Sequence, residues 1–330
     1  MTRSFGQSRD DNALAPAEPV RRPVTVVGGV KLDLFARAPR WPAHGGVTLC
    51  ESGLIDGGGK GANQALMVAR MGWPAALISC VGNDIAGAGL LAHLKASGVD
   101  VSGVRQDDGA CTGVFMLFSA PAEQRGIVVV NGANGRLRVE DVERQADAVR
   151  GSAALIAQLE VPGPAVEAAL RIACSAGALT VFNASPCFEF PRSILKYCDY
   201  VIVNEDEARW LTGAEACDLS GAAEAARRIA AMGARSALVT MGARGVWTHT
   251  AGWQEHTPAW RILPDDAEAA VGAGDVFVGA FTARLCEGAP VREAVRFAAA
   301  AAALSVTRRG AQAGLPARND VESLLRDPSA

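Results

Sequence analysis

Short apolar runs alternate along this chain with longer segments whose apolar residues recur at helical spacing. The runs are rich in valine and isoleucine and almost continuously apolar, which is typical of strands covered on both faces. They predict strands at residues 24–28, 76–81, 154–159, 179–182, 200–203 and 237–240. The intervening segments predict helices at residues 62–71, 86–97, 165–175, 221–232, 275–286 and 291–306. This alternation predicts an α/β fold of three layers, with helices on both sides of a mostly parallel central sheet.

Two segments break this rhythm. Residues 35–57 contain several prolines and glycines before a short strand-like run, and residues 109–131 contain a predicted hairpin with strands at 113–118 and 126–130. Together they predict a small β-sheet beside the main domain, placed as a lid over a ligand at the mouth of the central sheet. The domain then spans residues 23–330, and the polar residues 1–22 are predicted to be a disordered N-terminal tail.

Composition excludes several classes of protein. Of the 330 residues, 49% are hydrophobic and 20% charged, and the formal net charge of -3 gives no reason to expect nucleic acid or an anionic membrane as a partner. No apolar run is long enough to span a bilayer, and the N-terminus lacks a signal pattern. Eight cysteines without metal-type spacing predict reduced core residues, and hence a cytoplasmic protein.

The strongest chemical motif is Gly272-Ala273-Gly274-Asp275, which precedes an apolar helix. The glycines permit a tight turn, and the first N–H groups of the helix form an anion site suited to a phosphoryl group. Asp275 would accept a proton from an attacking hydroxyl there, although as a single motif it could equally be a plain helix N-cap.

Three further motifs have both a functional and a structural interpretation. The run from Gly57 to Ala65, with Lys60 and Asn63, could present donors to sugar hydroxyls or could be only a tight turn into a helix. It is not a P-loop, because Gly61 stands where Ser or Thr is needed. The acids after Asn204 could bind magnesium through water or could only cap a helix. The segment 240–245 permits nucleotide approach, as many β-turns would.

In this order, the motifs resemble those of the ribokinase-like, pfkB-type carbohydrate kinases. The similarity runs from about residue 24 to about residue 325 and is most specific at residues 58–65, 157–160, 204–213, 239–247, 272–275 and 306–312. It implies an ATP-dependent kinase that phosphorylates a sugar hydroxyl, most often converting D-ribose to D-ribose 5-phosphate. It also implies a β-sheet lid through which two chains form a homodimer.

The resemblance assigns roles to individual residues. It implies that Asp275 is the general base and that Gly272, Ala273 and Gly274 form the anion hole. The residues implied to face the sugar are Lys31, Asp33, Gly58, Gly59, Lys60, Asn63, Glu160 and Asp275. Those implied to lie along ATP are Asn204, Thr240, Gly242, Ala243, Arg244, Gly245, Gly274 and Ala299. Glu207 and Asn204 are implied to hold the Mg²⁺ of Mg–ATP through water.

The chain departs from the family pattern at three places. Lys31 replaces the usual Asn of the sugar site, which removes an acceptor and adds a charge, so it could favour an anionic sugar or could simply pair with Asp33 or a lid acid. Ala299 replaces a residue that is often polar near adenosine. The usual Asp-Thr of the potassium site is replaced by Ala269 and Ala270, with Asp265 and Asp266 upstream, and Gly314 replaces a Ser. These changes predict weak or absent potassium activation.

Other functions remain as alternatives. One is a related kinase for another pentose, a ketohexose, a sugar acid or a nucleoside. Another is a catalytically silent sugar-binding or regulatory protein, which would have no need of Asp275. A nicotinamide-dependent oxidoreductase is disfavoured, because residues 28–33 lack the G-x-G-x-x-G fingerprint.

Overall fold

The structure is a computed structural model that describes residues 21–121, 124–262 and 271–327. In this part of the chain the main sheet has nine strands in the order β13-β12-β11-β10-β9-β8-β1-β4-β5. All neighbours from β5 to β11 are parallel, and β12 and β13 extend the edge as antiparallel strands. The strands are β1 (Val24–Val27), β4 (Ala75–Gly82), β5 (Val99–Asp107), β8 (Ala154–Ala157), β9 (Leu179–Asn183), β10 (Tyr200–Asn204), β11 (Ser236–Thr240), β12 (Val246–His249) and β13 (Gln254–Thr257).

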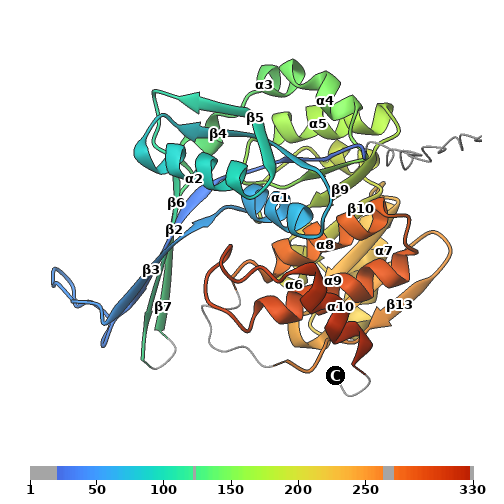
Figure 1. Cartoon of the computed structure of the whole chain (residues 1–330). Helices are drawn as coiled ribbons and strands as arrows, with labels where there is room; N and C mark the ends of the chain where they lie inside the picture. Colours follow the sequence, from blue (N-terminus) through green and yellow to red (C-terminus); the bar gives the residue numbers. More distant parts are fainter. Residues whose placement is uncertain (1–20, 122–123, 263–270, 328–330) are drawn as a thin grey trace, which may run out of the picture.

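Helices cover both faces of this sheet (Figure 1). One face packs against α1 (Lys60–Arg70), α2 (Ile85–Ala96), α8 (Ala273–Cys286), α9 (Val291–Ser305) and α10 (Arg318–Arg326). The other packs against α3 (Val139–Arg144), α4 (Ala146–Arg150), α5 (Gly163–Ser175), α6 (Glu205–Thr212) and α7 (Leu219–Ala231). Short 3₁₀ turns are η1 (Gly132–Arg136), η2 (Arg192–Tyr197) and η3 (Gly242–Arg244).

The two cores show why the strands are apolar throughout. Along β8, Leu155 and Ala157 belong to the core on the α5 side, whereas Ala154 and Ile156 belong to the core on the α8 side. Because successive side chains of a strand point to opposite faces, a strand covered on both faces needs apolar residues at every position. The predicted α/β fold with a mostly parallel sheet is therefore confirmed.

A second, smaller sheet projects from the main domain as an arm (Figure 1). Its strand order is β3-β2-β6-β7, formed by β2 (Lys31–Arg37), β3 (Ser52–Gly58), β6 (Gly113–Ala120) and β7 (Gln124–Val130). The two outer pairs are antiparallel and the central pair β2–β6 is parallel. The small predicted sheet is present, but its first strand begins at Lys31 rather than within residues 35–57, because Lys31 and Asp33 interrupt the apolar pattern that marks a strand.

Three expectations about the rest of the chain need comment. The predicted tail lies outside the described residues up to position 20, whereas the Arg22 guanidinium donates to the carbonyl of Gly151 at 2.9 Å. The prediction that the cysteines are core residues is wrong for most of them, since only Cys80 and Cys198 are buried, although all eight are free thiols. Within the described ranges, no helix has the length and apolarity needed to cross a membrane.

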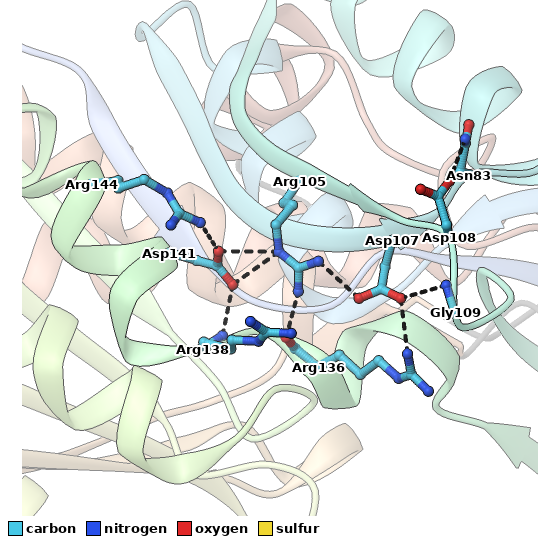
Figure 2. Close-up of polar contacts among 9 residues, drawn as sticks. All are labelled: Asn83, Arg105, Asp107, Asp108, Gly109, Arg136, Arg138, Asp141 and Arg144. Carbon is cyan, nitrogen blue, oxygen red and sulfur yellow. Dashed lines mark hydrogen bonds and ion pairs between the residues drawn. The ribbon is translucent and has the colours of Figure 1, made fainter.

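An ion-pair cluster fastens the connections between the main domain and the β6–β7 hairpin (Figure 2). Arg105 in β5 donates to Asp107 at 2.8 Å and to both carboxylate oxygens of Asp141 in α3 at 3.1 Å. Asp107 also accepts from Arg136 at 3.0 Å and from the Gly109 N–H at 2.9 Å. Since residues 108–112 lead into β6 and η1 follows β7, the cluster joins the outgoing and returning chain.

The cluster predicts a stability effect confined to acid pH. The hydrogen bond from Arg105 is the main cause that lowers the pKa of Asp107 from 3.8 to about 2. Because the folded-state pKa lies below the unfolded one, the ionised carboxylate stabilises the fold above pH 3.8, and this stability is lost as the pH falls toward about 2. The gap in thermal midpoint between the native protein and Asp107→Asn should therefore be full near neutral pH and close over this window.

The matched control is Asp147→Asn, because Asp147 pairs with Arg150 at 2.7 Å on a fully exposed side chain. Its midpoint should differ little from that of the native protein at any pH. A constant gap for Asp107→Asn from neutral to acid pH would show that Asp107 contributes no charge-dependent stability.

Candidate active site

Polar side chains gather where the parallel strands end. Gln158 and Glu160 follow β8, while Asn183, Asn204 and Thr240 are the last residues of β9, β10 and β11. Ligands of open α/β sheets bind at this carboxyl edge. The small sheet leaves the main domain at the same edge, since β2 follows β1 directly.

A cavity of about 360 Å³ lies between the β11–β12 region and the start of α8. Its walls are mostly small or apolar, and two aromatic side chains, Trp260 and Phe277, contribute to it. The residues that line it are Thr240, Gly242, Ala243, Gly245, Val246, Ala259, Trp260, Ile262, Ala273, Gly274, Phe277, Ala299, Ala302, Ala303 and Val306. The structure thus brings together six residues predicted for ATP, and an apolar slot of this kind suits a flat aromatic ring such as a base.

The start of α8 separates this cavity from a second, polar region. Gly272 precedes the helix with a positive φ of 89°, a conformation that favours glycine. Ala273 and Gly274 face the cavity, and a side chain at Gly274 would meet no atom within 4 Å. The first N–H groups of a helix lack intrahelical partners and carry positive potential, so this helix start is suited to an anion.

Asp275 lies on the polar side of the same turn and is buried. Its carboxylate accepts from Gln64 at 2.9 Å and from Asn63 at 3.2 Å, both in α1, and Lys60 Nζ lies 3.8 Å away. These donors come from the motif that begins at Gly57, so two stretches more than 200 positions apart in sequence form one cluster.

Burial and charge shift both ionisable groups of this cluster. Burial, as the largest cause, raises the pKa of Asp275, whereas Lys60 and the amides of Gln64 and Asn63 act in the opposite direction. Burial also disfavours the Lys60 ammonium, but the carboxylates of Asp275, Glu160 and Glu207 outweigh it and raise the pKa of Lys60. The arrangement can therefore hold a proton acceptor next to a permanent cation.

Lys31 forms a buried ion pair in the same region. Its Nζ lies 2.6 Å from Glu160 Oε1, and the side chains are only 6% and 9% exposed. The other oxygen of Glu160 accepts from the Lys60 backbone N–H at 2.7 Å. Of the two partners that the sequence suggested for Lys31, Asp33 or an acid of the small sheet, neither forms this pair, which instead engages Glu160 of the main domain.

Asp33 and Asp56 face each other across β2 and β3 of the small sheet. Burial first, and then the nearby carboxylates of Glu160 and Asp56, raise the pKa of Asp33 to about 8. At neutral pH Asp33 is therefore mostly protonated, so it can donate one hydrogen bond to a ligand as well as accept.

Close packing accounts for the glycines that precede α1. An added Cβ at Gly58 would lie 2.1 Å from the carboxyl group of Asp33, and one at Gly61 would lie 2.5 Å from the Gly28 backbone. Gly59 has a φ of 88°. These positions need glycine to bring the small sheet and α1 against the β1–β2 connection, whether or not they also touch a ligand.

The acidic motif after β10 forms a helix cap. Asn204 accepts from the Glu207 N–H at 2.8 Å, and Glu207 accepts from the Asn204 N–H at 2.8 Å. Arg244 contacts Glu205 and the Cys217 carbonyl instead of lining the cavity. Among the residues that the structure describes, no group of three or more His, Cys, Asp or Glu side chains could hold a metal ion.

Sequence reasoning also missed several residues of the site. Gln64, Gln158, Asn183 and Gln312 are buried polar residues within or beside the cluster, and three of them lie inside the motif segments that carried the family resemblance. Of the residues behind the potassium prediction, Asp265, Asp266, Ala269 and Ala270 lie outside the described residues, so that prediction remains open. Gly314 donates its N–H to the Gly310 carbonyl at 3.0 Å.

Comparison with known proteins places the chain among sugar kinases. The family model described as pfkB family carbohydrate kinase matches residues 22–318. The ribokinase of Haemophilus influenzae is 34% identical over 93% of this chain and 99% of its own length, and a deoxyribokinase of Salmonella typhi is 30% identical over 89% and 95%. The structure of Arabidopsis thaliana ribokinase complexed with ribose and ATP is 27% identical, with a TM-score of 0.84 over 93% of this chain and 99% of that one.

Proposed function

This chain belongs to the pfkB family of carbohydrate kinases, and we propose that it transfers the γ-phosphoryl group of ATP to O5 of D-ribose, giving D-ribose 5-phosphate. The observation that carries this proposal is the position of Asp275. It lies on the first turn of α8, with the 360 Å³ cavity on one side and the polar cluster of Asn63, Lys60 and Glu160 on the other. A phosphoryl group passing between the two regions would cross this turn.

Asp275 is proposed as the general base. It takes the proton of the sugar hydroxyl as the oxygen attacks the γ-phosphorus, and the bond between that phosphorus and the β–γ bridging oxygen breaks to release ADP. The N–H groups of Ala273, Gly274 and Asp275 and the ammonium of Lys60 face the charge that develops on the transferred group. Phosphoryl transfer depends mainly on such positioning and charge stabilisation, so no further nucleophile is needed.

Magnesium is proposed to enter with ATP. When bound, Mg²⁺ supplies charge neutralisation on the phosphates. The hard oxygen donors at the end of β10 fit this ion, since Glu207 presents a carboxylate that is held in place by the Asn204 N–H. Asn204 and Glu207 would hold waters of the Mg–ATP complex.

The Lys31–Glu160 pair supports a neutral sugar over an anionic one. Because Glu160 already neutralises Lys31 at 2.6 Å, the lysine has no unpaired charge to offer a sugar acid or a sugar phosphate. Asp33, Asp56 and Asp275 add negative potential to the same region. A polyhydroxyl ligand such as ribose, which both donates and accepts, fits these side chains.

The outer face of the small sheet is proposed as a homodimer interface. Cross-strand pairing aligns Ile55, Leu34, Met116 and Val128 in one row on the face opposite Asp33. Ile55 is 71% exposed and Val128 is 49% exposed, which is unusual for side chains of this kind on a sheet. The proposal predicts a dimer by light scattering, which Ile55→Lys should convert to a monomer.

The experiment that tests the function follows ADP release from Mg–ATP with D-ribose and with deoxyribose, other pentoses, hexoses, sugar acids and nucleosides, at varied potassium. Fast turnover with D-ribose supports the proposal. Turnover only with another substrate would move the protein to a sister kinase, and ATP binding without turnover would favour the silent sugar-binding protein. A large rate increase on adding potassium would contradict the predicted weak activation.

Filling the apolar cavity should weaken ATP binding selectively. Ala303→Phe adds a ring to the cavity wall on α9, and overpacking of this size commonly costs 1–3 kcal/mol, which predicts a KM for ATP raised about 10- to 100-fold. The KM for the sugar should stay within about twofold. Ala88→Phe on the exposed side of α2 is the matched control and should change neither constant. Equal rises in both KM values for Ala303→Phe would argue against a nucleotide cavity.

A further inference from the structure

We infer that two buried glutamines, Gln158 and Gln312, are positioning residues for Asp275, because each holds a neighbouring amide group with its N–H directed at the Asp275 carboxylate. Neither glutamine contacts Asp275 itself. They act through Gln64 and Asn63, the two side chains that donate to it. The inference rests on the proposed function in one respect, namely that Asp275 must be ionised to accept a proton.

The first relay runs through the core of the main domain. Gln158 Nε2 donates to Gln64 Oε1 at 2.7 Å, and Gln64 Nε2 donates to Asp275 Oδ1 at 2.9 Å. Gln64 Nε2 also lies 3.3 Å from Asn183 Oδ1, and the Asn183 amide in turn donates to the Ile202 carbonyl at 3.0 Å. All three atoms of the Gln64 amide group that can form hydrogen bonds are therefore directed by fixed partners.

The second relay reaches Asp275 from the opposite side. Gln312 Nε2 donates to Asn63 Oδ1 at 3.1 Å, and Asn63 Nδ2 donates to Asp275 Oδ2 at 3.2 Å. The Gln312 backbone is itself held by the small sheet, because its N–H donates to Asp56 Oδ2 at 3.0 Å. This relay therefore connects strand β3 of the small sheet to the base.

The direction of each amide group is what the relays control. A carboxamide can present either its oxygen or its N–H groups, and rotation by half a turn would place the Gln64 or Asn63 oxygen against the Asp275 carboxylate. Gln64 and Gln158 are fully buried, and Asn63 and Gln312 are at most 3% exposed, so bulk water is not available as a substitute partner. Buried Gln158 Oε1 and Gln312 Oε1 have no hydrogen-bond partner, so each glutamine keeps its donor on the relay although its own acceptor stays unsatisfied.

The chemical consequence is a lower pKa for the base. Burial raises the pKa of Asp275, and the N–H groups of Gln64 and Asn63 oppose this by stabilising the ionised carboxylate. Without the relays, each amide group could turn its oxygen toward Asp275, which would favour the protonated acid. The relays thus keep the base ready to accept a proton at neutral pH.

The test replaces each glutamine with methionine, which keeps the chain length and removes the donor. In Gln158→Met and Gln312→Met, the acidic limb of the kcat profile should move to higher pH by about one pH unit, and kcat near neutral pH should fall about tenfold. At high pH kcat should recover, and the KM for ATP should stay unchanged. Gln254→Met, on the exposed edge strand β13, is the control and should leave the profile in place. A loss of kcat that is equal at every pH would reduce both glutamines to structural residues and overturn the inference.

A second measurement does not depend on activity. The pH dependence of the difference in thermal midpoint between a protein and its Asp275→Asn version reports the pKa of Asp275 in the folded state. In the methionine variants, this difference should extend to higher pH than in the native protein. An unchanged pH window would overturn the inference even if the native protein phosphorylated no sugar, whereas a shifted window without any turnover would overturn the proposed function alone. Because the two glutamines lie on separate segments, the Gln312→Met result remains decisive if Gln158→Met does not fold.

Discussion

Asp275→Asn should lower kcat by about 10²- to 10⁴-fold, with the KM for ATP almost unchanged. The side chain keeps its size and its place on α8, but it can no longer take the proton of the attacking hydroxyl. The measurement is steady-state ADP release with saturating sugar. Asp206→Asn is the control, since that acid is on the first turn of α6 and is 82% exposed, and it should retain full activity.

The same substitution should raise stability at neutral pH. The pKa of Asp275 is raised in the folded state, so ionisation above the unfolded pKa of about 4 works against folding, and this loss grows until the pH passes the folded pKa. Asparagine has no charge to bury and should remove this pH-dependent loss. A lower thermal midpoint for Asp275→Asn than for the native protein at neutral pH would contradict the raised pKa, and activity above a tenth of the native value would exclude Asp275 as the base.

Lys31→Met should destabilise the protein by about 3–5 kcal/mol, the typical effect of removing one partner of a buried ion pair. Glu160 would be left as a buried carboxylate with the Lys60 N–H as its described partner. The double variant Lys31→Met with Glu160→Leu should recover much of the loss, because it removes both charges from the interior. Urea unfolding followed by fluorescence gives the free energy of unfolding for each variant.

An exposed pair of the same length provides the control for this prediction. Arg292 and Glu255 are also 2.6 Å apart, but their side chains are 61% and 43% exposed, so Glu255→Gln should cost less than about 1 kcal/mol. If Lys31→Met cost no more than this exposed substitution, the Lys31–Glu160 contact would not be a tight buried pair, and the argument that it favours a neutral sugar would fail with it.

The central fold could be read from the sequence because its signals are local. The apolar run predicted at residues 200–203 is β10 (Tyr200–Asn204), and the helix predicted at residues 275–286 is α8 (Ala273–Cys286). Two-sided burial in a parallel sheet requires apolar residues at every position of a strand, and that requirement is visible in the chain itself. The strand β5 (Val99–Asp107) was missed because it lies at the sheet edge and contains five charged or polar side chains, Asp100, Ser102, Arg105, Gln106 and Asp107.

The strand β2 shows a different limit. Its first residues include Lys31 and Asp33, whose charges argue against a buried position when the sequence is considered alone. They are buried because Glu160 neutralises one and because burial and neighbouring acids raise the pKa of the other to about 8. Both partners and neighbours come from distant parts of the chain, so the pattern of β2 makes sense only once they are in place.

The sequence alone determined the type of fold and the identity of the groups that carry the proposed chemistry, since a glycine turn, a helix start and an acid on its first turn are neighbours in the chain. The tertiary structure decided how those groups behave. The proton affinity of Asp275 depends on its burial, on Lys60, and on amide groups that Gln158 and Gln312 hold in place. These residues come from α1, from the end of β8 and from the segment after α9. They meet because parallel strands bring their carboxyl ends to one edge, and no local pattern encodes that meeting.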